Sequence, residues 1–307
     1  MIPGLENITD ATYCGYVALV GRPNVGKSTL LNRLLGTKLS ITSRKPQTTR
    51  HNLLGVDTRG TYQALYVDTP GMHEPGGRGV NRYMVRSAIA ALKDVDLAVM
   101  LVDQDQFNNG DALVLERIRE AEVPALVALN KVDRLKPKER LLPAIKALEQ
   151  RHRFAAFLPI SATTGEGVEA LRLAVHERLP AGAFQFDADA LTDQSERFLV
   201  AEIIREKLMR RLGEELPYEL TVQVERFEDD GAGLVDIAAN IYVEKPGQKQ
   251  IVIGRGGEKL KAIGADARAD IERLLDRRVM LRLWVKVRPG WSNDERSLQR
   301  LGYGSDQ

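Results

Sequence analysis

Short apolar segments alternate with longer amphipathic segments over residues 16–178. The apolar segments read YVALV, YQALYVD, LAVMLVD, PALVALN and FAAFLPIS, and each is followed by a loop and a stretch in which apolar residues recur with helical spacing. The expected helices cover residues 27–35, 80–92, 111–120, 137–150 and 168–179. Because strands that are apolar along their whole length are typical of parallel sheets covered on both faces, this half predicts a doubly wound α/β domain with a mostly parallel sheet.

The pattern changes after residues 180–194, PAGAFQFDADALTDQ, which combine glycine, proline and acidic residues without helical periodicity. We therefore expect a first domain at residues 1–180, a linker at 181–194 and a second domain at 195–307. The second domain is predicted to be of the α+β type, with a helix at 195–212, strands at 220–228 and 234–243, a glycine loop, another helix and a last strand at 279–287. The tail after residue 288 has too little apolar content for another core, and Trp291 either pins it to the domain, our default, or stacks on a base.

Composition narrows the class of protein. The 307 residues, 43% hydrophobic and 28% charged, are typical of a soluble globular protein with room for two domains. No apolar run approaches the roughly 18 residues of a membrane span, and residues 1–15 lack the apolar core of a secretory signal. The single cysteine, Cys14, cannot form an internal disulfide. These features favour the cytoplasm.

Charge is distributed unevenly despite a net charge of only +2. Residues 214–244 contain nine acidic side chains and one basic, whereas residues 245–288 contain twelve basic and five acidic. Adjacent segments of opposite sign predict a polarised face on the second domain, which suits a nucleic acid once a binding motif is attached to it.

A phosphate-binding loop lies where the first strand meets the first helix, within VALVGRPNVGKSTLLNRL. The spacing Gly21-x4-Gly26-Lys27-Ser28 fits the motif in full. The glycines let the backbone wrap phosphates, Lys27 can reach the outer two phosphates, and Ser28 offers a hydroxyl to Mg²⁺. The expected nucleotide contacts from this loop are Gly21, Asn24, Val25, Gly26, Lys27, Ser28 and Thr29.

Further candidates follow the later strands, at the sheet edge where ligands of such folds bind. Asp68 can hold Mg²⁺ through water, and the Gly71 N–H can approach a terminal phosphate. Asp133 can accept two hydrogen bonds from guanine, whereas adenine would leave it unpaired, so we expect a guanine nucleotide. A backbone N–H near Ser161 can meet the guanine carbonyl. The expected contacts here are Asp68, Thr69, Pro70, Gly71, Asn130, Lys131, Asp133, Ser161 and Ala162.

With these motifs, residues 16–179 resemble the small GTPases of the translation-factor-related class. The resemblance implies that SRKPQTTRH is a first switch in which Thr49, with Thr48 as the alternative, binds Mg²⁺ beside Ser28 and Asp68. It assigns hydrolysis to Lys27, Thr49 and Gly71, and it makes EPGGRG (residues 74–79) a second switch.

Met72 occupies the place where Ras-like enzymes have a glutamine that orients the attacking water. A thioether cannot polarise water, so we expect slow intrinsic hydrolysis. Asn24 resembles the asparagine that coordinates K⁺ in several cation-dependent GTPases. A purely loop-shaping role for Asn24 is an equal alternative.

A second motif, Gly254-Arg255-Gly256-Gly257, lies within QIVIGRGGEKLKAIG, where QIVI is predicted to be a strand. A G-x-x-G loop lets a nucleic-acid backbone approach closely, and the helix that follows attracts phosphate. In its context, residues 195–288 resemble a type II KH domain. The resemblance implies that Arg255, Lys259 and Lys261 contact phosphates and that Ile253 and Ile263 line the groove; for Ile251 we expect core packing.

Taken together, nearly the whole chain resembles the KH-domain ribosome-assembly GTPases. The resemblance implies a monomeric GTP/GDP switch that uses Mg²⁺, binds the 3′ end of 16S rRNA and acts in maturation of the 30S ribosomal subunit. It also implies a cytoplasmic protein that is partly peripheral at the inner face of the cell membrane. The alternative is an RNA-binding scaffold in which the nucleotide is mainly structural. The four histidines (His51, His73, His152 and His176) show no metal-ligand or acid/base spacing and are expected at the surface or in loops.

Overall fold

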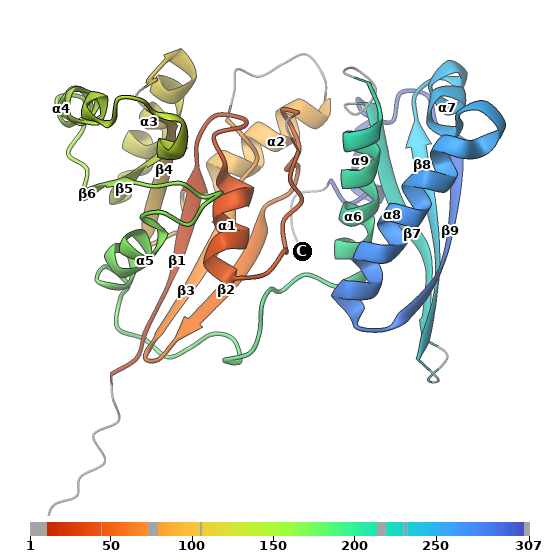
Figure 1. Cartoon of the computed structure of the whole chain (residues 1–307), viewed down its shortest axis with the longest axis horizontal. Helices are drawn as coiled ribbons and strands as arrows, with labels where there is room; N and C mark the ends of the chain where they lie inside the picture. Colours follow the sequence, from red (N-terminus) through yellow and green to blue (C-terminus); the bar gives the residue numbers. More distant parts are fainter. Residues whose placement is uncertain are drawn as a thin grey trace, which may run out of the picture. The chain divides into compact units, whose positions relative to one another are not determined.

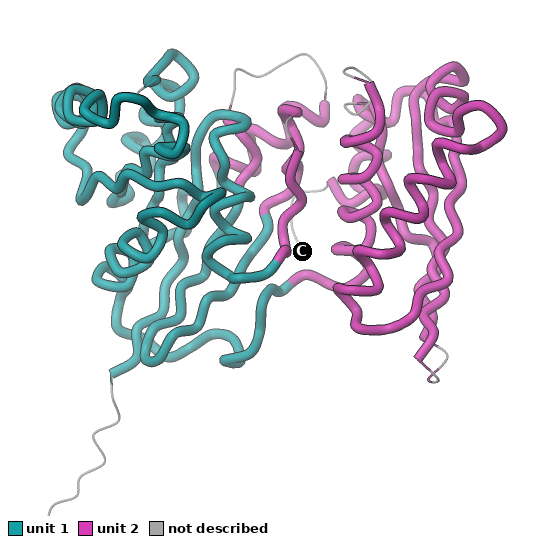
Figure 2. The backbone as a smooth tube through the Cα atoms, in the orientation of Figure 1, with its two compact units in different colours: residues 1–37, 53–68, 90–193 teal, residues 38–52, 69–89, 194–307 magenta. Residues whose placement is uncertain are grey.

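The computed structural model describes residues 11–43, 45–72, 79–104, 106–213, 219–229, 231 and 233–303. The chain forms two compact units (Figure 2). The first comprises residues 1–37, 53–68 and 90–193, and the second comprises residues 38–52, 69–89 and 194–307. In the part of the chain that the structure describes, no helix has both the length and the apolar content needed to cross a membrane.

The first unit contains a six-stranded sheet with strand order β2-β3-β1-β4-β5-β6 (Figure 1). The strands are β1 (Tyr13–Val20), β2 (Leu53–Arg59), β3 (Tyr62–Asp68), β4 (Leu97–Asp103), β5 (Ala125–Asn130) and β6 (Ala156–Pro159). All neighbours are parallel except β2, which pairs antiparallel with β3. The central strands are almost completely buried, as the apolar runs predicted. The predicted doubly wound fold is therefore confirmed.

The sequence reading missed β2, whose segment LLGVDTR has no uninterrupted apolar run. The strand forms because the two residues Gly60 and Thr61 connect it to β3 in a tight hairpin, with Gly60 at φ 58°. A left-handed conformation at such a turn favours glycine and matches the twist of paired strands.

Four helices of the first unit begin close to the predicted positions: α1 (Lys27–Leu35), α3 (Asn109–Ala121), α4 (Leu141–Glu149) and α5 (Val168–His176). Helix α3 begins after Asn108, whose side chain accepts hydrogen bonds from the Gly110 and Asp111 N–H groups. Helix α4 begins four residues later than the predicted 137 because Lys138–Arg140 forms a 3₁₀ turn (η2) instead.

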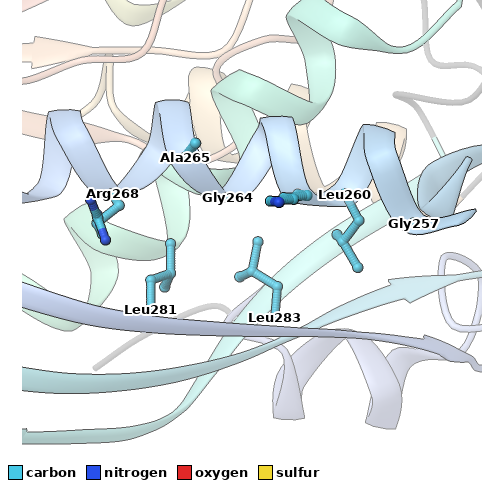
Figure 3. Close-up of a pocket in the computed structure, with 8 residues that line it drawn as sticks. Gly257, Leu260, Gly264, Ala265, Arg268, Leu281 and Leu283 are labelled. Carbon is cyan, nitrogen blue, oxygen red and sulfur yellow. The ribbon is translucent and has the colours of Figure 1, made fainter.

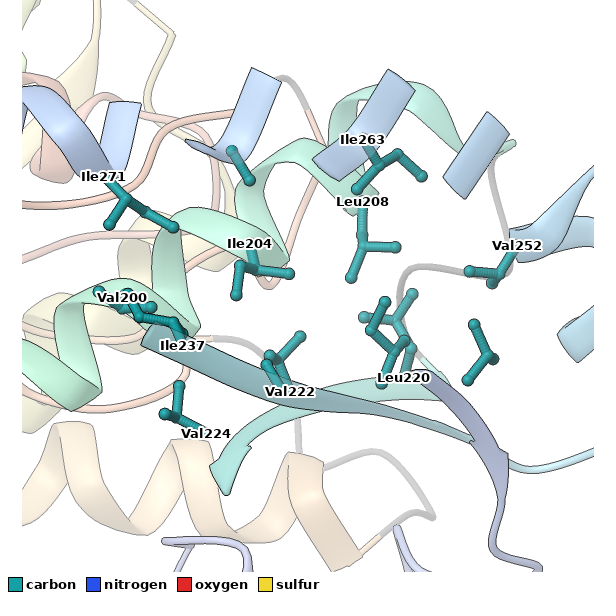
Figure 4. Close-up of a cluster of buried hydrophobic side chains, with 14 of the residues drawn as sticks. Val200, Ile204, Leu208, Leu220, Val222, Val224, Ile237, Val252, Ile263 and Ile271 are labelled. Carbon is teal, nitrogen blue, oxygen red and sulfur yellow. The ribbon is translucent and has the colours of Figure 1, made fainter. Parts of the chain in front are cut away.

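The second unit contains a three-stranded sheet of β7 (Leu220–Asp229), β8 (Leu234–Val243) and β9 (Arg278–Val287) in that order. Strands β7 and β8 are antiparallel, and β8 and β9 are parallel. Helices α6 (Glu196–Arg211) and α8 (Glu258–Leu275) pack against the sheet and against each other. Figure 4 shows the core between them, to which Val200, Ile204 and Leu208 of α6, Val222 and Ile237 of the sheet, and Ile263 and Ile271 of α8 contribute.

The segment before the G-x-x-G loop is a helix, α7 (Pro246–Ile253), and not the predicted strand. A short apolar run such as QIVI does not by itself distinguish a strand from a helix. Here Pro246 occupies the first turn, where its missing N–H costs nothing, and the Gln248 side chain accepts from the Lys245 N–H at 2.9 Å. A consequence is that Ile251 is exposed, so the core role expected for it is wrong.

The tail forms a small core, contrary to the prediction from its own composition. Trp291 is fully buried and packs with Leu298, Leu301 and Tyr303 around Val80 of helix α2 (Gly79–Ala90). The Trp291 Nε1–H donates to the Glu219 carbonyl at 3.3 Å. The apolar side chains of the tail form a core only together with those of α2. The local sequence pattern of the tail does not show that α2 packs there. The pinning role expected of Trp291 fits its burial, and helix α9 (Glu295–Arg300) was not anticipated.

Candidate nucleotide-binding site and nucleic-acid groove

The loop before α1 adopts a backbone that only glycine tolerates. Gly26 has φ 106°, and a Cβ at this position would lie 2.3 Å from Asn130 Nδ2. The Lys27 ammonium donates to the carbonyl oxygens of Gly21 at 3.0 Å and Arg22 at 3.1 Å. The loop thus curls around the ammonium group, which is the geometry of a phosphate cradle whose charge is already in place.

Two predicted magnesium ligands meet beside this loop. The Ser28 hydroxyl, in the first turn of α1, donates to Asp68 Oδ2, at the end of β3, at 2.6 Å. A hydroxyl and a carboxylate are the hard oxygen donors that Mg²⁺ prefers, so this pair fits the ion. Burial lowers the pKa of Lys27 to about 8, and the Asp68 carboxylate opposes part of that shift.

Asn130 connects three loops of the first unit. Its Nδ2 donates to the Val25 carbonyl at 2.7 Å, and its Oδ1 accepts from the N–H groups of Lys131 at 2.8 Å and Ala162 at 3.0 Å. The predicted base-binding residues therefore lie together with the phosphate loop. A backbone N–H near Ser161 is expected to meet a guanine carbonyl; here the Ala162 N–H donates to Asn130 Oδ1, and the Ser161 N–H donates to the Glu166 carbonyl.

Asp133 lies in the 3₁₀ turn η1 (Val132–Arg134) directly after this point, with 27% of its side chain exposed. The neighbouring Lys131 has φ 65°, and its ammonium donates to the Asn24 carbonyl at 2.9 Å and to Asp103 Oδ2 at 2.7 Å. The Lys131 side chain thus lies against the phosphate loop, while Asp133 remains accessible to a ligand.

Sequence reasoning missed two carboxylates that support the loop. Asp103 binds Lys131, and the buried Asp111 accepts from Arg22 Nε at 3.3 Å. Burial raises the pKa of Asp111, against the lowering effects of Asn108 and Arg22. The sequence feature that could have identified Asp103 is its position, because it ends a strand at the same sheet edge as Asp68 and Asn130.

The segment expected to be the first switch, residues 38–52, folds with the second unit. Fully buried Glu206 of α6 accepts from the Thr42 N–H at 2.9 Å and from Lys38 Nζ at 2.6 Å. Arg205 Nη2 donates to the Thr48 carbonyl at 2.5 Å. The Thr48 hydroxyl donates to the Lys45 carbonyl at 2.7 Å within its own turn.

The end of the same segment reaches the tail. Arg50 Nη1 donates to the Leu220 carbonyl at 2.8 Å and to the Tyr303 hydroxyl at 3.2 Å. The His51 ring stacks on Tyr303 with centroids 4.6 Å apart. Helix α2 is held there too, because the Val80 N–H donates to the Ser292 carbonyl at 3.0 Å.

Thr69 and Pro70, between β3 and α2, are buried, and Met72 is 1% exposed. Met72 packs away from solvent, as a thioether with no role toward water would. The predicted second switch, residues 74–79, lies outside the described residues except for Gly79, whose N–H donates to Asn293 Oδ1 at 3.0 Å.

The G-x-x-G loop opens into a pocket of about 480 Å³ between α8 and β9. Gly254, Gly256 and Gly257 all have positive φ, and a Cβ on Gly254 would lie 2.7 Å from the Lys259 Cβ. Figure 3 shows α8 above β9 with the lining side chains between them. The pocket is lined by Gly257, Leu260, Lys261, Gly264, Ala265, Arg268, Leu281 and Leu283.

The groove residues differ in part from those expected. Ile263 is fully buried in the core and cannot line the groove, because the periodicity of α8 turns it toward α6. Ile253 is half-buried against the same core. The apolar lining comes instead from Leu260, one turn earlier on α8, and from Leu281 and Leu283 of β9. Arg255 and Lys261 are exposed beside the loop, as expected for phosphate contacts, and Lys259 is half-buried.

One histidine, His176, differs from the expectation of surface or loop positions. His176 of α5 is buried and stacks on Tyr62, with ring centroids 4.7 Å apart. Burial lowers its pKa. His51 lies in the loop before β2, as expected, and is half-buried in the aromatic group around Tyr303. Each imidazole serves as a flat packing surface, which the scattered spacing of the histidines does not reveal.

Comparisons with known proteins agree with both halves. Residues 16–131 match the family of 50S ribosome-binding GTPases, and residues 215–292 match the KH domain family. The protein "GTPase Era" of Pseudomonas fluorescens is 54% identical over 296 residues, which cover 96% of this chain and 98% of that protein. "GTPase Era" of Pseudomonas aeruginosa is 54% identical over 299 residues, covering 97% and 98%.

Two solved structures are similar over the whole fold. One is a variant of Aquifex aeolicus Era bound to GDP.AlF4-, with 37% identity and a TM-score of 0.92, covering 95% of this chain and 100% of that one. The other is Era in complex with MgGDPNP and nucleotides 1506–1542 of 16S ribosomal RNA, with 37% identity and a TM-score of 0.92, covering 95% and 99%.

Fold and site define the class of protein, a P-loop GTPase followed by a KH domain. Within that class, identity of 54% over nearly the full length is decisive: the chain belongs to the Era family of GTPases.

Proposed function

We propose that this GTPase is a molecular switch that binds the 3′ end of 16S rRNA through its KH groove and acts in maturation of the 30S ribosomal subunit. The relative solved with MgGDPNP and nucleotides 1506–1542 supports this, since it holds the same two kinds of ligand. The observation that carries the coupling is the position of residues 38–52. This segment, the expected sensor of the γ-phosphate, bonds to α6 and the tail of the KH unit.

At the nucleotide, the phosphate loop (Gly21, Asn24, Val25, Gly26, Lys27, Ser28, Thr29) would cradle the phosphates. Ser28, Asp68 and Thr49 would hold Mg²⁺, which supplies charge neutralisation for phosphoryl transfer. Thr49 is proposed as the ligand and Thr48 as its alternative, and the Thr48 hydroxyl donates to the Lys45 carbonyl within its own turn. Lys27, Thr49 and Gly71 would act on the γ-phosphate. Asn130, Lys131, Asp133, Ser161 and Ala162 would form the guanine pocket, with Thr69 and Pro70 shaping the approach.

Hydrolysis without help is proposed to be slow, because buried Met72 offers nothing to orient water. The same feature favours the second candidate, an RNA-binding scaffold with a structural nucleotide. RNA-stimulated turnover distinguishes the two, since a scaffold would show none. Potassium stimulation through Asn24 is proposed equally with a loop-shaping role, which the φ of 63° at Asn24 and the bond from Lys131 to its carbonyl support.

At the RNA, the loop Gly254, Arg255, Gly256 and Gly257 would approach the backbone, and Lys259 and Lys261 would contact phosphates. Leu260, Leu281 and Leu283 would contact bases in the groove. A groove of this kind holds about four nucleotides. The RNA in the relative's complex, nucleotides 1506–1542, is 37 nucleotides long.

The remaining properties that the family resemblance implies are also proposed. They are a boundary between the GTPase and KH domains at residues 181–194, a monomeric state, and a cytoplasmic location with part of the protein peripheral at the inner face of the membrane. The first is compatible with family matches that end at residue 131 and begin at residue 215.

The experiment is the affinity for a single-stranded RNA matching the 16S rRNA 3′ end, measured with GDP and with GDPNP. We expect tighter binding with GDPNP and loss of binding in Arg255→Asp. Lys146→Asp, an equal charge change at an exposed site in the first unit, is the control and should bind normally. Equal affinity with both nucleotides would remove the switch and leave the scaffold.

A further inference from the structure

The outer face of strand β9 carries an unusual set of exposed side chains. Arg278, Met280, Arg282, Trp284 and Lys286 alternate with residues that face the helices, so they share one face of the sheet. Met280 is 52% exposed and Trp284 is 48% exposed. We call these five residues the outer row of β9.

Two neighbouring parts of this sheet face are covered by other residues of the described chain. Asn240 of β8, the neighbour of Trp284, is buried and donates to Glu225. The tail covers the other end of the face, where Tyr242 packs against the Trp291 group. Among the described residues, Met280 and Trp284 are therefore the most exposed large apolar side chains of this face.

The charge of the outer row is positive. Arg282 pairs with Asp236 of the adjacent strand. For Arg278 and Lys286 the described residues supply no carboxylate within salt-bridge distance, so two cations at the ends of the row are available to a ligand.

Protection of an edge strand accounts for only part of this pattern. Arginine and lysine on an edge strand prevent pairing with another sheet. A half-exposed tryptophan does not serve that purpose, because it adds an apolar surface that invites association. Cations interleaved with a flat aromatic ring are instead the elements of a single-strand nucleic-acid surface, where bases stack on aromatic rings and cations follow the backbone.

The row is continuous with the groove through β9 itself. Leu281 and Leu283 line the groove on one face of the strand, and Arg282 and Trp284 are their immediate neighbours on the other. β9 is an edge strand of the sheet, so a chain leaving the groove needs only to cross one strand.

We propose that the RNA of the groove continues over the edge of β9 onto this outer row, where a base stacks on Trp284 and phosphates lie near Arg278 and Lys286. The inference rests on the proposed RNA-binding function and extends it. It gives the nucleotides beyond the four in the groove a second binding surface on the same domain.

Tryptophan fluorescence of the full chain tests the stacking directly. The chain has two tryptophans, of which Trp291 is fully buried, so quenching by a stacked base reports Trp284. An RNA of about four nucleotides, which fills only the groove, should bind without quenching, and a longer single strand that continues beyond it should quench. Equal quenching by both, or none by the longer RNA, would overturn the proposal.

Affinities separate this surface from the groove. Trp284→Ala should weaken binding of the longer RNA about tenfold and leave the short RNA unchanged. The double variant Arg278→Gln and Lys286→Gln should reduce the slope of log affinity against log salt by about 1.4 for the longer RNA. Lys146→Gln together with Lys249→Gln, two cations outside the outer row, is the matched control.

The outcomes are distinguishable. If the unchanged protein binds neither RNA, or if Arg255→Asp does not weaken either, the proposed function fails. If both RNAs bind and Trp284→Ala with a normal melting temperature leaves the longer RNA unaffected, the inference fails and the outer row of β9 is a surface for a protein partner.

Discussion

At the scale of single residues, the loops of the candidate nucleotide site are connected largely by side chains that bond to the backbone of neighbouring loops. Asn130 connects the phosphate loop, the start of η1 and the loop after β6 with three bonds. Lys131 adds a fourth link by joining Asn24 to Asp103. These residues follow a strand, as a base-binding motif requires. They also give the carbonyl groups of Asn24 and Val25 in the phosphate loop a side-chain donor.

Replacing Asp133 by asparagine should change the base that the site accepts. A carboxylate accepts from the ring N–H and the amine of guanine, whereas an amide donates on one side and so matches xanthine, which has a carbonyl in place of the amine. We expect GTP affinity to fall at least tenfold, and xanthosine triphosphate to bind better than GTP. Competition against a fluorescent guanine nucleotide measures both, and unchanged preference for GTP would exclude Asp133 from the base site.

Stability should fall in mild acid through His176. Burial lowers the pKa of His176 below 6.5. The carboxylates of Asp57 and Glu169 oppose this shift, whereas the guanidinium groups of Arg172 and Arg59 add to it. The unfolded state therefore takes up the proton first, and the free energy of unfolding declines as pH drops below about 6.5, by at most about 1.4 kcal/mol per unit.

Calorimetric melting from pH 7.5 to 5 checks this, with His176→Phe as the control because phenylalanine keeps the stack on Tyr62. The variant should lose stability less steeply than the parent protein. An identical pH dependence in both would show that His176 does not contribute.

At the scale of elements, the tail and β9 show most clearly that an element's role depends on its neighbours in the fold as well as on its own sequence. The tail segment after residue 288 becomes a core because α2 brings Val80 to Trp291. Strand β9 serves two surfaces at once, since its alternation sends Leu281 and Leu283 to the groove and Met280 and Trp284 to the opposite face. In both cases an element acquires its role from what packs beside it.

The two tryptophans should differ sharply in their contribution to folding. Trp291→Ala removes a fully buried ring and its hydrogen bond to Glu219, so we expect the second unit to lose about 3–5 kcal/mol of stability. Trp284→Ala removes a half-exposed ring and should cost below about 1 kcal/mol. Urea unfolding of both variants measures the difference, and equal losses would contradict the burial of Trp291.

At the scale of the whole molecule, the notable feature is which unit holds the expected switches. Residues 38–52 and 69–89 belong to the same compact unit as the KH fold. The contacts include a charged group around Glu206, where Lys38 also reaches Asp270 at 3.1 Å. Burial raises the pKa of Asp270, but its hydrogen bonds with Lys207 and Lys38 outweigh burial and lower the pKa to about 2, so the carboxylate stays charged in the physiological range. The segment proposed to respond to the nucleotide is thus bonded directly to the KH fold.

Cutting one of these links should weaken the communication between nucleotide and RNA. Lys38→Met removes the bonds to Glu206 and Asp270 while leaving the phosphate loop and the groove intact. We expect the ratio of the RNA affinity with GDPNP to that with GDP to fall about threefold to fivefold, toward one. This fold-change corresponds to the free energy of a partly exposed ion pair. Lys146→Met is the control, and a ratio identical to that of the parent protein would exclude this contact from the coupling.

The sequence alone determined the features that depend on local chemistry. Spacing of glycines, lysine and serine identified the phosphate loop, strand ends identified Asp68, Asn130 and Asp133, and uninterrupted apolar runs identified the parallel sheet. Only the tertiary structure decided what depends on long-range packing: the helix at Pro246–Ile253, the burial of Ile263, the leucines of the groove and the attachment of residues 38–52 to α6. The physical reason is that a residue's local pattern fixes its backbone preference, whereas the free energy of burying it depends on surfaces contributed by residues far away in the chain.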